Sequence, residues 1–117
     1  MAFKFEELKV WQRALNFTLA VHQVTLGFPK EELFVLSSQI KRAADSIALN
    51  IAEGSTGQSN PEFNKFLGYA VRSAIEVVSC LHIGRKRNII KDDDFQSLYI
   101  ESTIIIKMIQ ALRNSLN

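Results

Sequence analysis

Helix-breaking residues are scarce in this chain, and their positions constrain its fold more than any other feature. The 117 residues include only 5 Gly and 2 Pro. All but Gly68 fall at or beside three breaks, at 27–29, 54–61 and 84–91. Because Gly and Pro end helices and form turns, these breaks divide the chain into four long segments. Each segment has apolar residues at the three-to-four spacing of an α-helix.

We predict helices over about 6–26, 30–53 and 61–87, and a fourth from the acidic run at 92–94 nearly to residue 117. Gly27 is expected at the C′ position of the first helix, and Gly54 is expected to end the second. Asn60 is the predicted N-cap of the third helix, with Pro61 as its first residue. Short links between long helices favour an all-α, antiparallel up-down-up-down four-helix bundle in a single domain, 1–117.

Composition and charge permit an anionic partner without requiring one. The hydrophobic fraction of 47% and charged fraction of 22% are ordinary for a globular chain. The net charge is +2 and the isoelectric point about 8.8, slightly below the value above 9 that is typical of a dedicated nucleic-acid domain. A single cysteine, Cys80, excludes an internal disulfide and fits a reducing compartment. No signal peptide or membrane span is recognised, so a cytoplasmic location is expected.

Two apolar stripes run along the first predicted helix, although a surface helix of a monomer needs only one. The first is assigned to the core and consists of Leu8, Trp11, Leu15, Leu19, His22 and Leu26. The second, together with part of the fourth helix, is the candidate oligomer interface and consists of Val10, Ala14, Phe17, Val21, Val24, Ile104 and Met108. If this second stripe were left exposed, it would form a larger apolar patch than monomeric proteins usually expose. If this stripe forms the interface, replacing Phe17 and Val21 with aspartate should dissociate the oligomer into single chains. The alternative is a broad core that uses both stripes.

A polar stripe lies beside the core face of the second predicted helix. Its members are Gln39, Arg42, Ser46, Asn50 and Glu53. One interpretation is that these side chains bond to a neighbouring helix or chain and so fix its register. In that case Asn50 would reach the third helix. The other interpretation is a ligand-binding surface.

Four sequence blocks carry a family resemblance. They are FEELKVWQRAL at 5–15, FPKEE at 28–32, SSQIKRAADSIALNIAEG at 37–54 and FLGYAVRSAIEV at 66–77. With these blocks the chain resembles the 23S rRNA intervening-sequence proteins. The resemblance implies a four-helix bundle that assembles as a ring-shaped homopentamer, and it implies no reaction. It suggests a role connected with RNA or the ribosome. A more distant resemblance is to the accessory proteins of diversity-generating retroelements, in which a basic ring contacts nucleic acid and a reverse transcriptase.

The sequence has no recognisable catalytic or metal-binding motif, and no cofactor is expected. His22 and His82 are the only histidines, and with Cys80 they cannot supply four zinc ligands. His22 is assigned to the core. The acidic run at 92–94 suits the N-terminus of a helix by its charge alone. The stretch GSTGQSN at 54–60 lacks the lysine of a phosphate-binding loop and follows a helix instead of a strand. We therefore predict a protein that is not an enzyme.

Basic residues supply the candidate nucleic-acid site. They are Lys41, Arg42, Lys65, Arg72, Arg85, Lys86, Arg87 and Lys91. Repeated around an oligomer, they would produce a stronger field than one chain has. No basic stretch is interleaved with aromatic residues, so RNA or DNA would be bound through backbone phosphates with little sequence preference. Two alternatives remain. The cations at 85–91 could serve only to complement a helix dipole, and the oligomer could be a scaffold for a protein partner.

Overall fold

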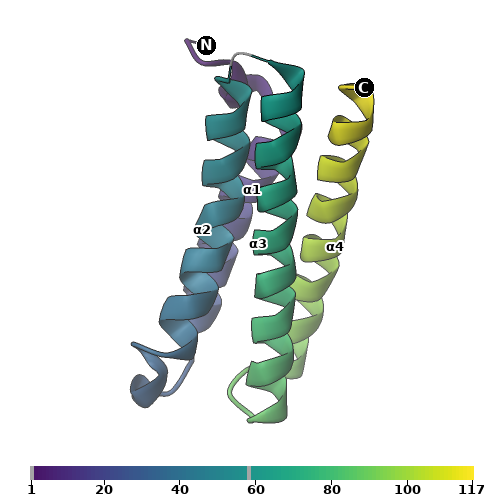
Figure 1. The fold of residues 1–117 in the computed structure, drawn as a ribbon. Helices are drawn as coiled ribbons and strands as arrows, with labels where there is room; N and C mark the ends of the chain where they lie inside the picture. Colours follow the sequence, from purple (N-terminus) through teal and green to yellow (C-terminus); the bar gives the residue numbers. More distant parts are fainter. Residues whose placement is uncertain (1, 58) are drawn as a thin grey trace.

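The fold is all-α, as predicted. The computed structural model describes residues 2–57 and 59–117, and within these it has four α-helices and two short 3-10 helices. The α-helices are α1 (Lys9–Thr25), α2 (Leu36–Ser55), α3 (Asn60–Lys86) and α4 (Asp92–Ser115), and the 3-10 helices are η1 (Lys4–Glu7) and η2 (Lys30–Glu32). Consecutive α-helices run in opposite directions, with both termini at the same end of the molecule (Figure 1). The bundle measures 43 × 24 × 19 Å.

Each helix of the bundle packs on two neighbours. Contacts join α1 to α2, α2 to α3, α3 to α4 and α4 to α1. All four helices contribute to a single core, whose largest fully buried side chains include Phe17, Ile47, Leu67 and Ile105. The up-down-up-down topology predicted from the short links is therefore confirmed.

The stripe of α1 that was predicted to form the oligomer interface is buried in the core of a single chain, while the stripe assigned to the core packs there only through Leu8 and Trp11. Val10, Ala14, Phe17 and Val21 are at most 5% exposed within a single chain, and Val24 packs on the core as a half-buried residue. The stripe assigned to the core instead carries Leu15, Leu19 and Leu26, which are 47%, 59% and 85% exposed. Both stripes recur at helical spacing, so the periodicity could not show which one the neighbouring helices would cover.

The second helix begins later than predicted. Residues 30–32 form η2, and α2 starts at Leu36 after Val35, whose backbone is outside the helical region at φ −120° and ψ −99°. The Glu32 carboxylate accepts a hydrogen bond from the backbone N–H of Leu36 at 3.3 Å. This bond satisfies one of the N–H groups that have no partner in the first turn of a helix. Glu32 therefore caps a helix that begins six residues after the predicted start at residue 30.

Ser59, and not Asn60, is the N-cap of α3. The Ser59 hydroxyl accepts from the backbone N–H of Glu62 at 3.3 Å. The Asn60 side-chain amide donates to the backbone carbonyl of Leu116 at 3.4 Å and so connects the start of α3 to the end of α4. Either residue type can cap a helix, and the sequence alone placed the cap one position too late.

Gly54 lies inside α2, where it allows a close approach to α3. The helix continues to Ser55, and Gly54 is buried. A methyl group at this position would lie 2.5 Å from Cβ of Phe66 and 3.1 Å from Cδ1 of Phe63. The first of these atoms is attached directly to the α3 backbone and cannot rotate away. Gly54 was predicted to stop the helix, whereas its structural role is to make room for α3.

One helix passes a test for a membrane span on length and composition alone. This is α3, with a mean hydropathy of 1.3 in its most apolar window. Core helices of globular proteins pass the same test. In the bundle α3 contributes Leu67, Ala74, Val77 and Leu81 to the core, and 39% of its apolar window is buried.

Candidate functional site

Three cations line one groove between α3 and α4. Lys65 and Arg72 come from α3, and Arg113 comes from the last turns of α4. Gly68, Tyr69 and Val71 complete the lining of this groove, whose volume is about 370 Å³. We call it the basic groove. Two of its three cations were predicted from the sequence. The third was missed because Arg113 lies 41 positions after Arg72, on a different helix.

Arg113 is held in the basic groove by neutral partners. Its Nε donates to Oδ1 of Asn64 at 2.6 Å, and its Nη1 donates to Oε1 of Gln110 at 3.3 Å. Gly68 provides the room, because a Cβ there would lie 3.4 Å from the Nη2 atom. Amide oxygens orient a guanidinium without cancelling its charge. The positive charge of Arg113 therefore remains available at the surface.

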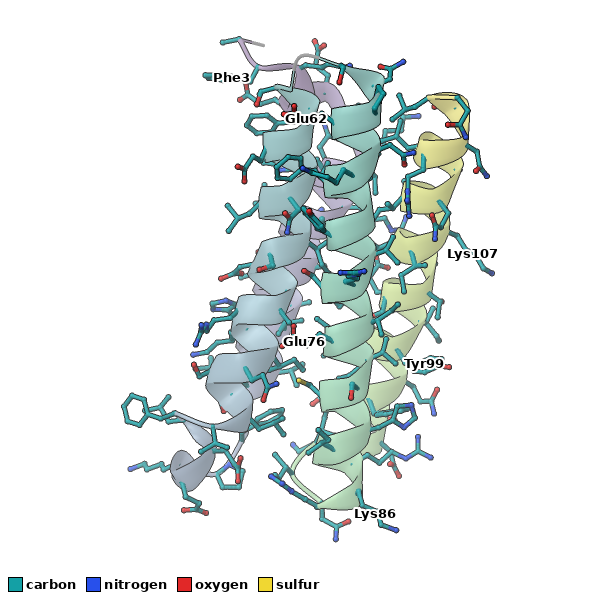
Figure 2. The ribbon with its side chains drawn as sticks, in the orientation of Figure 1. Phe3, Glu62, Glu76, Lys86, Tyr99 and Lys107 are labelled. Carbon is teal, nitrogen blue, oxygen red and sulfur yellow. The ribbon has the colours of Figure 1, made fainter. Side chains whose placement is uncertain are left out.

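The carboxylates in the middle of α3 and α4 are directed away from the basic groove. Beyond their first turns these helices carry one carboxylate each, Glu76 and Glu101. Glu76 lies on the side of α3 that faces α2 (Figure 2) and accepts from Nε2 of Gln39 at 3.5 Å. Glu101 forms a bidentate pair with Arg13 of α1, at 2.5 and 3.0 Å, and its hydrogen bond and charge raise the pKa of that guanidinium. Within residues 2–57 and 59–117, no carboxylate forms an ion pair with a cation of the groove.

The other predicted cations do not join the basic groove. Arg42 lines a separate groove between α2 and α3, close to Glu76. Lys41 is half-buried on α2. Arg85 and Lys86 end α3, Arg87 is its C-cap, and Lys91 is the N-cap of α4. The eight candidates are thus divided among separate surfaces, and the sequence could not show this division because it depends on how the helices pack.

The polar stripe of α2 lies partly beside α3. Gln39, Arg42 and Ser46 line the groove of about 550 Å³ between these helices, and Gln39 makes the bond across to α3 described above. Asn50 does not reach α3. Its Nδ2 donates to the backbone carbonyl of Ser46 on its own helix at 2.8 Å, and Glu53 is exposed. The predicted bridge from Asn50 to α3 is therefore wrong, and Gln39 makes the contact between the helices.

An apolar surface covers the outer side of α1 and α2. Its exposed residues are Leu15, Leu19 and Leu49, the last 65% exposed, and Trp11, Ala48 and Ala52 lie between them. We call this the α1–α2 apolar face. His22 borders it, with Nε2 of its ring 3.3 Å from Oδ1 of Asp45. His22 is exposed, so its assignment to the core was wrong. Ile104 and Met108 of α4 are half-buried, and Met108 faces α1.

Cys80 is poorly suited to nucleophilic chemistry. The thiol is buried at 2% exposure, and burial, with a further contribution from the charge of Glu76, raises its pKa to about 11. The reactive thiolate is then about 0.1% of the population at pH 8, against about a quarter for an ordinary thiol. Among the described residues there is also no group of three or more His, Cys, Asp or Glu able to hold a metal ion.

We expect iodoacetamide at pH 8 to alkylate Cys80 of the folded protein more than about a hundredfold more slowly than the same chain in urea. Mass spectrometry over a time course measures the two rates. Equal rates would show that the thiol is accessible and ionised in the folded state.

Comparison with known proteins establishes the family. The chain matches the family model for the 23S rRNA-intervening sequence protein over residues 6–111. The chain belongs to this family. In fold it is similar to the crystal structure of a Bacteroides thetaiotaomicron protein of unknown function from the S23 ribosomal protein family, with a TM-score of 0.80 and 26% identity. That match covers 89% of this chain and 97% of the other. No curated protein matches the chain.

Proposed function

We propose that this member of the 23S rRNA-intervening sequence family is a non-catalytic homo-oligomer that binds nucleic acid, with RNA as the leading candidate. The observation that carries the proposal is the convergence of Lys65, Arg72 and Arg113 in the basic groove. Among the described residues no carboxylate forms an ion pair with these three cations, so their charges add together. Cations grouped in this way attract backbone phosphates independently of sequence.

Self-association is the second part of the proposal. The α1–α2 apolar face would be covered by another copy of the chain, since side chains such as Leu19 at 59% exposure and Leu49 at 65% are costly to leave in water. The closed pentamer is taken from the family resemblance alone. In such a ring the basic groove would recur once per chain, and the field at the ring surface would rise accordingly. The resemblance to accessory proteins of diversity-generating retroelements adds support at the level of fold only.

The rival function is a scaffold for a protein partner. The supporting feature is the segment before α2, where Leu33, Phe34 and Val35 are 49%, 89% and 56% exposed. Three adjacent exposed apolar residues are suited to a protein contact. The scaffold function predicts no affinity for nucleic acid at any salt concentration.

The two functions are separated by fluorescence anisotropy with a generic single-stranded RNA of about 20 nucleotides. At about 50 mM salt we expect binding, and the logarithm of the affinity should fall linearly with the logarithm of the salt concentration. The double variant Lys65→Glu with Arg72→Glu should weaken binding more than about tenfold and reduce the salt slope by one to two.

The matched control is Lys30→Glu with Lys107→Glu, which makes the same change in net charge at exposed cations outside the basic groove. Figure 2 shows Lys107 projecting from α4 into solvent. The control should bind RNA within about threefold of the unchanged protein, because its groove is intact. Absence of binding by the unchanged protein at about 50 mM salt would reject the proposed function in favour of the scaffold.

A further inference from the structure

Three rings from α3 and α4 form an aromatic corner at the surface. Tyr99 and Phe95 stack with their ring centroids 5.7 Å apart and their planes at 21°. The His82 ring meets both edge-on, at 5.3 Å and 72° to Phe95 and at 6.1 Å and 89° to Tyr99. Phe95 is buried at 3% exposure, whereas Tyr99 is 37% exposed and His82 is exposed. The buried Phe95 ring therefore packs against the rings of Tyr99 and His82, which are roughly perpendicular to each other and exposed to solvent.

The cations at the end of α3 lie beside the aromatic corner. The Arg85 guanidinium carbon is 4.3 Å from the centroid of Phe95, which fixes the cation against the corner. Lys86 follows at the end of the helix (Figure 2). The acidic run of Asp92, Asp93 and Asp94 begins α4 nearby, and within residues 2–57 and 59–117 none of its carboxylates forms an ion pair with these cations. The corner thus combines two solvent-exposed rings with a fixed positive charge.

The aromatic corner and the basic groove lie along the same pair of helices. His82 follows Arg72 by ten residues on α3, which corresponds to about 15 Å along the helix at about 1.5 Å per residue. Tyr99 of α4 lies beside His82 of α3 in the lower half of the bundle (Figure 2). Arg113 lines the groove from the last turns of α4, toward the other end of that helix. An extended strand whose phosphates occupy the groove would run along α3 toward the corner.

We infer that the aromatic corner of His82 and Tyr99 receives an unpaired nucleobase, which makes the ligand a single-stranded nucleic acid and not a duplex. This inference rests on the proposed function, and it adds a contact to bases where that function needs only phosphates. Every nucleobase presents a flat π-face, so stacking stabilises a bound strand with little regard to sequence. In a duplex the bases are stacked on one another and cannot enter the corner.

The test compares three probes of equal length on the unchanged protein by anisotropy at about 50 mM salt. They are a mixed-sequence single-stranded RNA, the same strand in a duplex, and an abasic strand that has the phosphates and no bases. We expect the single-stranded RNA to bind about tenfold more tightly than the abasic strand, in line with one base stacked on an aromatic side chain. The duplex should bind less tightly than the single-stranded RNA, because its paired bases cannot enter the corner.

Variants then assign the base contact to the aromatic corner. Tyr99→Leu should weaken binding of the single-stranded RNA about tenfold and leave the abasic strand unchanged, while Tyr99→Phe should retain the affinity because the ring remains. His82→Gln is the second variant, and since His82 is exposed it should fold even if Tyr99→Leu does not. Phe34→Leu is the control, because it removes an aromatic ring that is 89% exposed at a different surface.

The outcomes separate this inference from the proposed function. Equal affinity for the single-stranded and abasic probes would overturn the base contact while leaving phosphate binding by the basic groove in place. The base contact is also overturned if both Tyr99→Leu and His82→Gln leave the preference for bases unaltered. Failure of all three probes to bind would reject the proposed function itself.

Discussion

Replacing Phe17 with aspartate is expected to unfold the chain. Phe17 is 1% exposed within one chain and packs in the core of the bundle. The substitution removes a large apolar side chain and introduces a carboxylate with no partner, and each change costs several kcal/mol. Since a domain of this size is stabilised by only about 5–15 kcal/mol, most of the helical circular dichroism at 25 °C should be lost.

Leu19→Asp is the matched substitution on the opposite stripe of α1. Leu19 is 59% exposed, so this variant should keep its helicity and lose at most about 1 kcal/mol of stability. If the α1–α2 apolar face joins copies of the chain, sedimentation equilibrium should show the Leu19→Asp protein at a smaller mass than the unchanged protein. A folded Phe17→Asp protein that dissociates while Leu19→Asp stays assembled would restore the interface first predicted from the sequence.

Gly54→Ala should lower the free energy of unfolding by about 2–3 kcal/mol. The added methyl group would lie 2.5 Å from Cβ of Phe66, so α2 and α3 must move apart along their closest approach. Alanine ordinarily stabilises a helix relative to glycine, and the predicted loss is therefore opposite in sign to the helix propensity. For a domain of about this size the midpoint of thermal unfolding should fall by about 10 °C.

Gly27→Ala provides the control for Gly54→Ala. A methyl group at residue 27 would meet only the carbonyl oxygen of Val24, at an ordinary 3.5 Å, and the backbone φ of Gly27 is not positive. Its unfolding midpoint should change by no more than about 2–3 °C. If both variants have the stability of the unchanged protein, the close approach of the two helices is not needed for the fold.

The number and type of the helices could be predicted because the signals involved are local. Gly27 with Pro29 and the turn before Pro61 interrupt the chain whatever its tertiary contacts are. Helix ends were less certain, since Ser59 and Asn60 are both good N-caps and only the hydrogen bond to Glu62 distinguishes them. The later start of α2 at Leu36 likewise depends on the backbone at Val35, which no residue type in that stretch specifies.

The functional surface could be predicted only where it lies on one helix. Lys65 and Arg72 are seven residues apart, a spacing that places both on one face of α3. Arg113 enters the same groove only because α4 runs antiparallel to α3 with Gly68 opposite it. The aromatic corner was missed for the same reason. His82 and Tyr99 come from different helices, so no basic stretch interleaved with aromatic residues exists in the sequence to reveal it.

The sequence by itself determined four amphipathic helices, their order and the presence of more apolar surface on α1 than one stripe requires. The tertiary structure alone decided which stripe of α1 is buried, why Gly54 is a glycine and which cations share a groove. The physical reason is the range of the interactions. Propensity, capping and periodicity act within about one helical turn. Burial and the convergence of charges depend on side chains from different helices, which only packing brings together.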